Sequence, residues 1–268
     1  MCAQVNPPDA SLVRFQFKSS SGGVCFASSS THFVKFGMTR VCHGEFSKSA
    51  MTRHLETCKQ RAITESKAGS RQKAQQTRKL HLVVEGRDLP MYWMHLGVTA
   101  STTLTTLDQF LRNTWLECCG HLSAFEIEGV RYAIDAGMYD DWDIGEKSMR
   151  VRLDKVLSPG QICSYEYDFG TTTELKLRMI SEYEVETKGK AIQVLARNTP
   201  PVIMCEACGK PATEVCSQWI FDDRGWLCDD RAEEHECGEE MLLPVVNSPR
   251  VGMCGLHRMI LGLILCVA

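Results

Sequence analysis

The residues with the clearest chemical potential lie between Cys205 and Cys237, where sulfur and imidazole side chains recur in closely spaced pairs. Thiolate and imidazole are the ligands that structural zinc prefers in proteins. The spacing is typical of two-zinc modules in which the first and third ligand pairs bind one ion and the second and fourth pairs bind the other. It therefore predicts two groups of ligands. The first group is Cys205, Cys208 and Cys228, and the second is Cys216, His235 and Cys237, with Cys254 or His257 as alternatives to Cys237.

Each predicted group is one ligand short of the usual four. Trp219 and Arg231 stand where a further cysteine would complete the second and third pairs. The arginine is permanently cationic and the indole has no usable lone pair, so neither side chain is a zinc ligand. Either three protein ligands hold zinc at each site, or the region is a zinc module that has lost one ligand from each half. In both cases a structural role is expected, with no catalytic residues.

A second candidate metal site lies near the start of the chain, where Cys42, His54 and Cys58 follow the pattern C-x11-H-x3-C. If residues 48–61 form a helix, His54 and Cys58 lie one turn apart on the same face. Zinc fingers present their second ligand pair in this way. Position 39, where the remaining cysteine is expected, is Thr39, and the alternative ligands His43, His32 and Cys25 would require unusual geometry. We expect Phe46 and Leu55 to form a small core.

The central part of the chain must position these groups, and its patterns predict an α+β fold with a mixed or antiparallel sheet and one main amphipathic helix. Residues 80–86 and 91–98 are expected to form strands joined by a turn, and residues 123–134 a hairpin around Glu128 and Gly129. Residues 161–170, 173–186 and 191–197 add further strands. The buried face of the helix is predicted from apolar residues at spacings of three and four, with an N-cap from residues 101–103. These residues are Leu104, Leu107, Leu111 and Trp115.

The predicted organisation has six parts. Residues 1–35 are a flexible N-terminus, 36–62 a zinc-finger-like unit, 63–79 a basic linker, 80–197 the α+β domain, 200–257 the cysteine-rich region and 258–268 an apolar tail. Fourteen cysteines without a recognisable export signal favour metal ligands over disulfides and a cytoplasmic location. The apolar tail is too short to cross a bilayer. Cys118, Cys119, Cys163 and Cys266 are expected to be packing residues or free thiols.

Charge is distributed unevenly although the net charge is only −3. Residues 59–79 carry seven Lys or Arg and one Glu, whereas residues 222–240 carry nine Asp or Glu and two Arg. The basic residues could contact nucleic-acid phosphates, but they are equally typical of a solvated linker. The candidate contacts are Lys48, Thr52, Arg53, Lys59, Arg61, Lys67, Arg71 and Lys73.

Several motifs resemble the plasmid pRiA4b ORF-3-like family: Trp93, the helix TLTTLDQFLRNTW, the run HLSAFEIEGVRY and, most specifically, YEYDFG at residues 165–170. The cysteine-rich region, including the distinctive residues 243–255, resembles an extension found on a subset of that family. Many members have an acidic pair and Trp after the motif glycine, where this chain has Thr171-Thr172-Thr173-Glu174. The resemblance implies an α+β fold and an association with plasmids and mobile elements, but no established reaction.

Three functions follow as hypotheses. The first is a non-enzymatic zinc-binding protein that docks an unidentified protein partner; the absence of phosphate-binding glycine motifs argues against a nucleotide ligand. The second is DNA or RNA binding through the zinc-finger-like unit and the basic linker. The third, and weakest, is an enzyme, and no membrane association is expected. The candidate acid–base residues of such an enzyme are His121, Tyr165, Tyr167, Asp168 and Glu174.

Overall fold

The computed structural model describes residues 36–40, 42–58, 76–134, 145–186 and 189–253. The predicted flexible N-terminus, most of the basic linker and the apolar tail lie outside these residues, as do Cys254 and His257.

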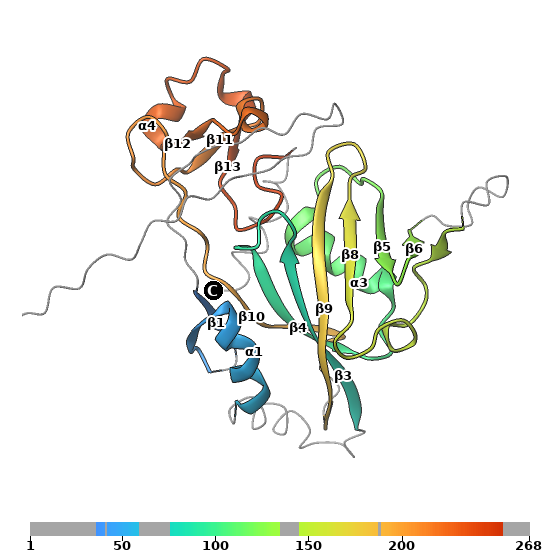
Figure 1. Cartoon of the computed structure of the whole chain (residues 1–268). Coiled ribbons are helices and arrows are strands. Elements are labelled where there is room, and N and C mark those ends of the chain that lie inside the picture. The colour runs from blue at the N-terminus through green and yellow to red at the C-terminus, as the bar shows by residue number, and fades with distance from the viewer. Residues whose placement is uncertain (1–35, 41, 59–75, 135–144, 187–188, 254–268) are drawn as a thin grey trace, which may run out of the picture.

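One ten-stranded sheet, in the order β2-β1-β10-β4-β3-β9-β8-β5-β6-β7, dominates the described chain (Figure 1). Neighbouring strands are antiparallel except β6 and β7, which are parallel. The sheet is therefore mixed, as expected. Its strands are β1 (Phe36–Thr39), β2 (Glu45–Ser47), β3 (Thr77–Gly86), β4 (Trp93–Thr99), β5 (Ser123–Ile127), β6 (Val130–Ala133), β7 (Lys147–Ser148), β8 (Ile162–Tyr167), β9 (Thr173–Val185) and β10 (Ile192–Asn198).

The predicted hairpin between β5 and β6 is confirmed. Ile127 pairs with Val130, so only Glu128 and Gly129 form the turn. Their φ angles are 52° and 75°. Two consecutive positive φ angles are the mark of the tight hairpin turn whose twist matches that of the strands, and glycine adopts this conformation without a steric penalty.

The main helix covers one face of the sheet. Helix α3 (Leu104–Leu111) continues into a π-helical turn, η1 (Arg112–Leu116). The four predicted core residues are at most 1% exposed, and the Thr103 hydroxyl accepts a hydrogen bond from the Thr106 amide as the N-cap. The periodicity of the apolar residues therefore identified the buried face correctly.

The N-terminal unit joins the same sheet. Strand β1 pairs with β10 and β2 pairs with β1, and helix α1 (Lys48–Thr57) follows directly. Met51 and Leu55 of α1 pack against Trp93, Leu195 and Ala196, with Phe46 at the edge of this cluster. The zinc-finger-like unit thus shares its core with β4 and β10, on the opposite face from α3.

The cysteine-rich region has only short elements. A three-stranded sheet, β12-β11-β13, lies beside the small helix α4 in the upper part of Figure 1. Val215, Ile220 and Trp226 belong to the same buried apolar cluster as α3 and the large sheet. The elements are β11 (Glu214–Cys216), η3 (Trp219–Asp222), β12 (Trp226–Leu227), α4 (Asp229–Ala232), η4 (Glu239–Met241) and β13 (Leu242–Pro244), and η2 (Leu153–Lys155) belongs to the central domain. The predicted α+β class, dominated by a sheet with one main helix, is confirmed.

Candidate metal centres

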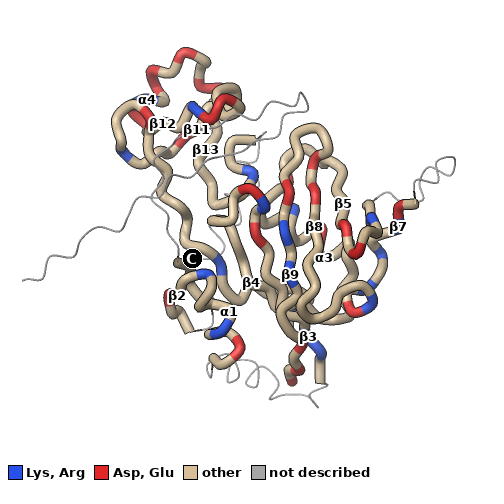
Figure 2. Tube along the Cα trace, viewed as in Figure 1, with Lys and Arg blue, Asp and Glu red and all other residues tan. Residues whose placement is uncertain are grey.

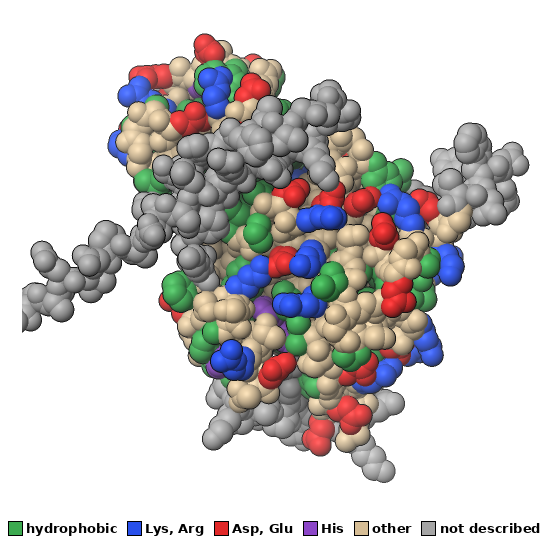
Figure 3. All heavy atoms as spheres, viewed as in Figure 1, with side chains coloured by type: hydrophobic (Ala, Val, Ile, Leu, Met, Phe, Trp, Pro, Cys, Tyr) green, Lys and Arg blue, Asp and Glu red, His purple; other side chains and the backbone are tan. Residues whose placement is uncertain are grey.

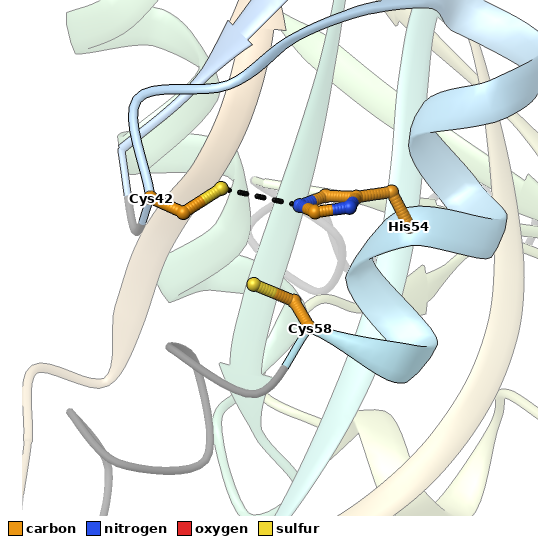
Figure 4. Close-up of side chains that lie close together, drawn as sticks. All are labelled: Cys42, His54 and Cys58. Carbon is orange, nitrogen blue, oxygen red and sulfur yellow. Dashed lines mark hydrogen bonds between the residues drawn. The ribbon is translucent and has the colours of Figure 1, made fainter.

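The N-terminal group lies between the turn after β1 and the end of α1 (Figure 4). Cys42 Sγ is 3.2 Å from His54 Nε2, and the ligand atoms of Cys42, His54 and Cys58 all lie within 4.8 Å of one another. Phe46 stacks on the imidazole of His54, with ring centroids 3.9 Å apart. Helix α1 ends at Thr57, so the predicted helix over residues 48–61 is too long: Cys58 is the C-cap residue and its backbone is extended. Its thiol still lies near the imidazole of His54, as the spacing predicted.

Thr39 occupies the position where a fourth ligand is expected. Its side chain is fully buried, and its Oγ1 lies 3.0 Å from Cys42 Sγ and accepts a hydrogen bond from the Cys42 amide. Burial raises the pKa of the Cys42 thiol, but hydrogen bonds from Thr39, the Gly44 backbone and Cys58 outweigh it and lower that pKa below its usual value. The group therefore favours the thiolate that a metal requires.

The second group combines a C-x-x-C knuckle with the start of α4. Cys205 and Cys208 lie in a tight turn that Gly209 closes with a φ of 70°, and Cys228 is the N-cap residue of α4. Cys208 Sγ and Cys228 Sγ are 3.5 Å apart, and all three sulfurs lie within 4.8 Å of one another. Three sulfurs from two distant segments therefore converge on one point.

Two thiols of this group, those of Cys205 and Cys228, have pKa values shifted in opposite directions. Burial alone raises the pKa of Cys205, but the backbone N–H groups of Cys228, Ala207 and Cys208 lower it to about 7. For Cys228, the backbone N–H of Arg231 lowers the pKa, yet burial and the two neighbouring thiols leave it above its usual value. The first thiolate thus forms readily and opposes formation of a second. A bound cation would remove that opposition.

The third group combines the end of β11 with the segment that follows α4. Cys216 ends β11, and His235 and Cys237 follow α4, with their ligand atoms within 4.8 Å of one another. His235 Nε2 is buried without a hydrogen-bond partner in the described chain. An unpartnered buried ring nitrogen is costly in a protein interior unless it binds a metal or a water molecule. The donor set of this group therefore fits a zinc ion.

The two C-terminal groups alternate along the chain, as the spacing predicted. Ligands of the first and third pairs lie together in one group, and ligands of the second and fourth pairs lie together in the other. The two residues that stand in place of the missing cysteines, Arg231 and Trp219, make different contacts. Arg231 is exposed and pairs with Glu234, whereas the Trp219 ring packs edge-on against His235 at 4.6 Å. Trp219 thus packs against a ligand of the third group, whereas Arg231 pairs with a carboxylate of its own segment.

Three of the candidate nucleic-acid contacts lie in the described chain, all on α1. Lys48 forms an ion pair with Glu85 and donates to the Pro90 carbonyl, whereas Arg53 is exposed. Thr52 is half-buried. Lys59, Arg61, Lys67, Arg71 and Lys73 lie outside the described residues.

The candidate acid–base residues have structural partners. Tyr165 donates to Asp108 at 2.8 Å and Tyr167 to Glu117 at 3.0 Å. Glu174 pairs with Arg87 at 2.7 Å. Asp168 accepts from Arg250 at 2.6 Å, and burial, which raises its pKa, is outweighed by Arg250 and the amides of Thr171 and Gly170, so that the pKa is lowered.

Sequence reasoning missed a fourth group. Cys118 and Cys119 were expected to be packing residues or free thiols, but the structure places both sulfurs within 4.8 Å of a His121 ring nitrogen. The C-C-x-H pattern is visible in the sequence. What the pattern does not reveal is the fold of the loop that brings the three side chains together.

Sequence reasoning also missed how segment 247–250 joins the cysteine-rich region to the central domain. Asn247 exchanges hydrogen bonds with Asn198, and Ser248 donates to the Trp115 carbonyl at 2.6 Å. Arg250 is fully buried and donates to Asp168, to the Thr171 carbonyl and to Thr173. The distinctive sequence motif therefore fastens one region onto the other.

With this geometry established, comparison with known families identifies the central domain. The family model of the plasmid pRiA4b ORF-3-like protein matches residues 76–217, just over half of the chain. The chain belongs to this family. The match runs from the residue before β3 to the residue after β11, so it includes Cys205, Cys208 and Cys216 but ends before the remaining C-terminal ligands.

Comparison with solved structures gives a weaker similarity than the match to the pRiA4b ORF-3-like family. A crystal structure of a protein of unknown function from Methanosarcina mazei Go1 is similar over 50% of this chain and 75% of that chain, with 16% identity and a TM-score of 0.37. No curated protein matches. Among the described helices, none has the length and apolar character needed to span a bilayer.

Proposed function

We propose that this pRiA4b ORF-3-like protein binds zinc at three sites and acts as a non-enzymatic interaction protein. The observation that carries the proposal is the convergence of cysteine and histidine ligands in three separate groups, each of which joins a closely spaced pair to a third ligand from another segment of the chain. Clusters of Cys and His side chains favour zinc over the hard, oxygen-seeking cations.

A structural role for the metal suits the elements around it. Helix α4 has four residues and strand β12 has two. A helix of this length is not stable in isolation, because nucleation costs more than one turn of hydrogen bonds recovers. Zinc bound at Cys228 would fix the start of α4, and zinc bound at His235 and Cys237 would fix the segment that follows it.

Zinc stoichiometry tests the proposal directly. Elemental analysis of the purified protein is compared with that of Cys42→Ser, Cys208→Ser and Cys237→Ser, one variant for each group. Each variant is expected to contain one zinc equivalent fewer than the wild type. Cys163→Ser is the matched control, since Cys163 lies buried in β8 outside the four ligand groups of the described chain. Equal zinc content in all five proteins would reject the proposal.

The interaction role is supported by the surface of the cysteine-rich region. Eight of the nine carboxylate residues between positions 222 and 240 are exposed, Asp223 being the exception. Figure 2 shows these acidic residues gathered around α4 and the chain beyond it. Such a surface favours a protein partner with a basic face and disfavours nucleic acid.

A charge-reversal variant tests this role. We expect a partner captured by the wild-type protein to be lost in Glu233→Lys/Glu234→Lys and at high salt, with zinc content unchanged. Retention of the same partner by the variant would place the docking surface elsewhere.

Nucleic-acid binding is the second candidate, favoured by the exposed Arg53 and the basic residues that follow α1. The face of the sheet seen in Figure 3 offers little support, since acidic and basic side chains are interleaved there. Lys176 and Arg87, for example, pair with Glu85 and Glu174. Replacing Lys59, Arg61, Lys67, Arg71 and Lys73 by Gln should abolish DNA binding and its salt dependence. Absence of binding by the wild type at low salt would exclude this function.

A further inference from the structure

A fourth ligand group, formed by Cys118, Cys119 and His121, lies in the loop that joins η1 to β5. It is separate from the three groups of the proposed function. Cys118 and His121 are half-buried and Cys119 is exposed, and one ligand atom from each lies within 4.8 Å of the other two. Adjacent cysteines do not by themselves make a metal site. Here, hydrogen bonds to the backbone of the loop keep the three ligand atoms close together.

Buried polar residues fix the backbone of this loop at successive positions. The Gly120 amide donates to Glu117 at 2.6 Å, and Arg112 donates to the His121 carbonyl at 2.6 Å. The Asp168 amide donates to the Leu122 carbonyl at 2.9 Å. Each of these hydrogen bonds involves a residue that is largely buried. They hold the loop in a conformation that keeps Cys118, Cys119 and His121 close together.

The anchoring residues are themselves held by side chains of the YEYDFG motif. Tyr165 donates to Asp108, which accepts from Arg112, and Tyr167 donates to Glu117. The Tyr167 hydroxyl also accepts a hydrogen bond from the Cys118 amide at 3.4 Å. The most specific motif of the chain thus builds the support of this loop.

His121 has the environment of a metal ligand. Its Nδ1 faces Asp168 Oδ1 at 3.6 Å, and its Nε2 is buried without a hydrogen-bond partner in the described chain. Metal-binding histidines commonly direct one ring nitrogen to a carboxylate, which orients the ring and leaves the other nitrogen for the metal. Asp168 is held in turn by Arg250 and by the amides of Gly170 and Thr171.

The surrounding charges also suit a cation. The guanidinium groups of Arg112 and Arg250 lie among three carboxylates, those of Asp108, Glu117 and Asp168, to which they are paired. Within this set of five groups, the carboxylates outnumber the guanidinium groups by one. Arg250 also donates to Cys118 Sγ at 3.8 Å, which holds that sulfur in place.

We propose that Cys118, Cys119 and His121 form a fourth metal site that binds a thiophilic divalent cation such as zinc. Three protein ligands leave one coordination position for water or a further ligand, as they do in the three groups of the proposed function.

The test is zinc content at saturating zinc, after removal of unbound metal, measured for the wild type, Cys118→Ser, Cys119→Ser and His121→Asn. Each variant should bind one equivalent fewer than the wild type. Cys119 and His121 are not core residues, so unchanged thermal unfolding would show that the fold is intact. Cys163→Ala is the matched control for loss of a thiol and should keep the wild-type content.

The outcome is independent of the three proposed zinc sites, because it is a difference between variants in which Cys42, Cys208 and Cys237 are unchanged. Equal zinc content in the wild type and all three variants would overturn the fourth site even if the other three hold metal. Loss of one equivalent in these variants alone, with Cys42→Ser and its companions unchanged, would support the fourth site and reject the proposed function.

Discussion

The central domain and the cysteine-rich region are stabilised in different ways. The central sheet has strands of up to thirteen residues, and its apolar residues form one continuous core with α3. In the cysteine-rich region the strands have two or three residues and the helix has four. Burial of apolar surface is sufficient for the first region, whereas we expect the second, which contributes only a few residues to that core, to depend also on metal at its ligand groups and on segment 247–250.

Removal of metal should separate the two regions most clearly. With a strong chelator, we expect amide hydrogen exchange to become much faster in α4 and β12 and to stay slow in β3, β4 and β9. The binding energy of structural zinc, about 10–16 kcal/mol in small zinc peptides, is largely folding energy for the elements that it joins. Equal protection of α4 with and without the chelator would show that the cysteine-rich region does not need metal.

The next largest effect is expected from Arg250→Ala. The substitution leaves the Asp168 carboxylate buried without its partner, which typically costs about 3–5 kcal/mol. Chemical denaturation should show this loss, and the cysteine-rich region should detach before the central sheet unfolds. Arg152→Ala is the control: Arg152 also pairs with an aspartate, but its side chain is 51% exposed, so a change within about 0.5 kcal/mol is expected.

Local features of both regions could be predicted from the sequence. Leu104, Leu107, Leu111 and Trp115 identified the buried face of α3 because helical periodicity is local. The members of each metal group could also be identified from the sequence, because the spacing of the ligands along the chain can be compared directly with that of known zinc modules. The structure brings those residues together as predicted, while metal binding itself stays a prediction.

Features that depend on distant segments could not be predicted. Asp168 and Arg250 both lie in motifs that the sequence analysis singled out, but they are 82 residues apart and neither motif predicts that they pair. The pairing of β1 with β10 and the anchoring of loop 117–122 by Arg112 and Tyr167 are likewise set by tertiary contacts. Without the fold of this loop, Cys118 and Cys119 were therefore predicted to be packing residues or free thiols.

A smaller effect is expected from Thr39→Cys. Residue 39 is buried beside Cys42 Sγ, so a thiol there would supply the fourth ligand of the N-terminal group. We expect zinc affinity at this group to rise about tenfold or more, equivalent to ~1.4 kcal/mol. Chelator competition measures the change, and Thr39→Val, which keeps the volume but adds no ligand, should give no increase. Equal affinities in the two variants would mean that position 39 is not a coordination position.

The smallest effect is the pH dependence of metal binding at the knuckle. The backbone amides lower the pKa of Cys205 from 9.0 to about 7 despite its burial, so this thiol is largely ionised above pH 7 before metal binds. In the metal-free protein this stabilisation is fully present above about pH 9 and is lost as the pH falls through about 7. Below pH 7 a proton must also leave Cys205 for each ion bound, so zinc affinity should fall more steeply there than just above it. Zinc titrations between pH 6 and about 8 of a Cys42→Ser/Cys119→Ser/Cys237→Ser variant, in which only the knuckle group is intact, measure this slope, and an equal slope on both sides of pH 7 would mean that Cys205 does not bind the metal.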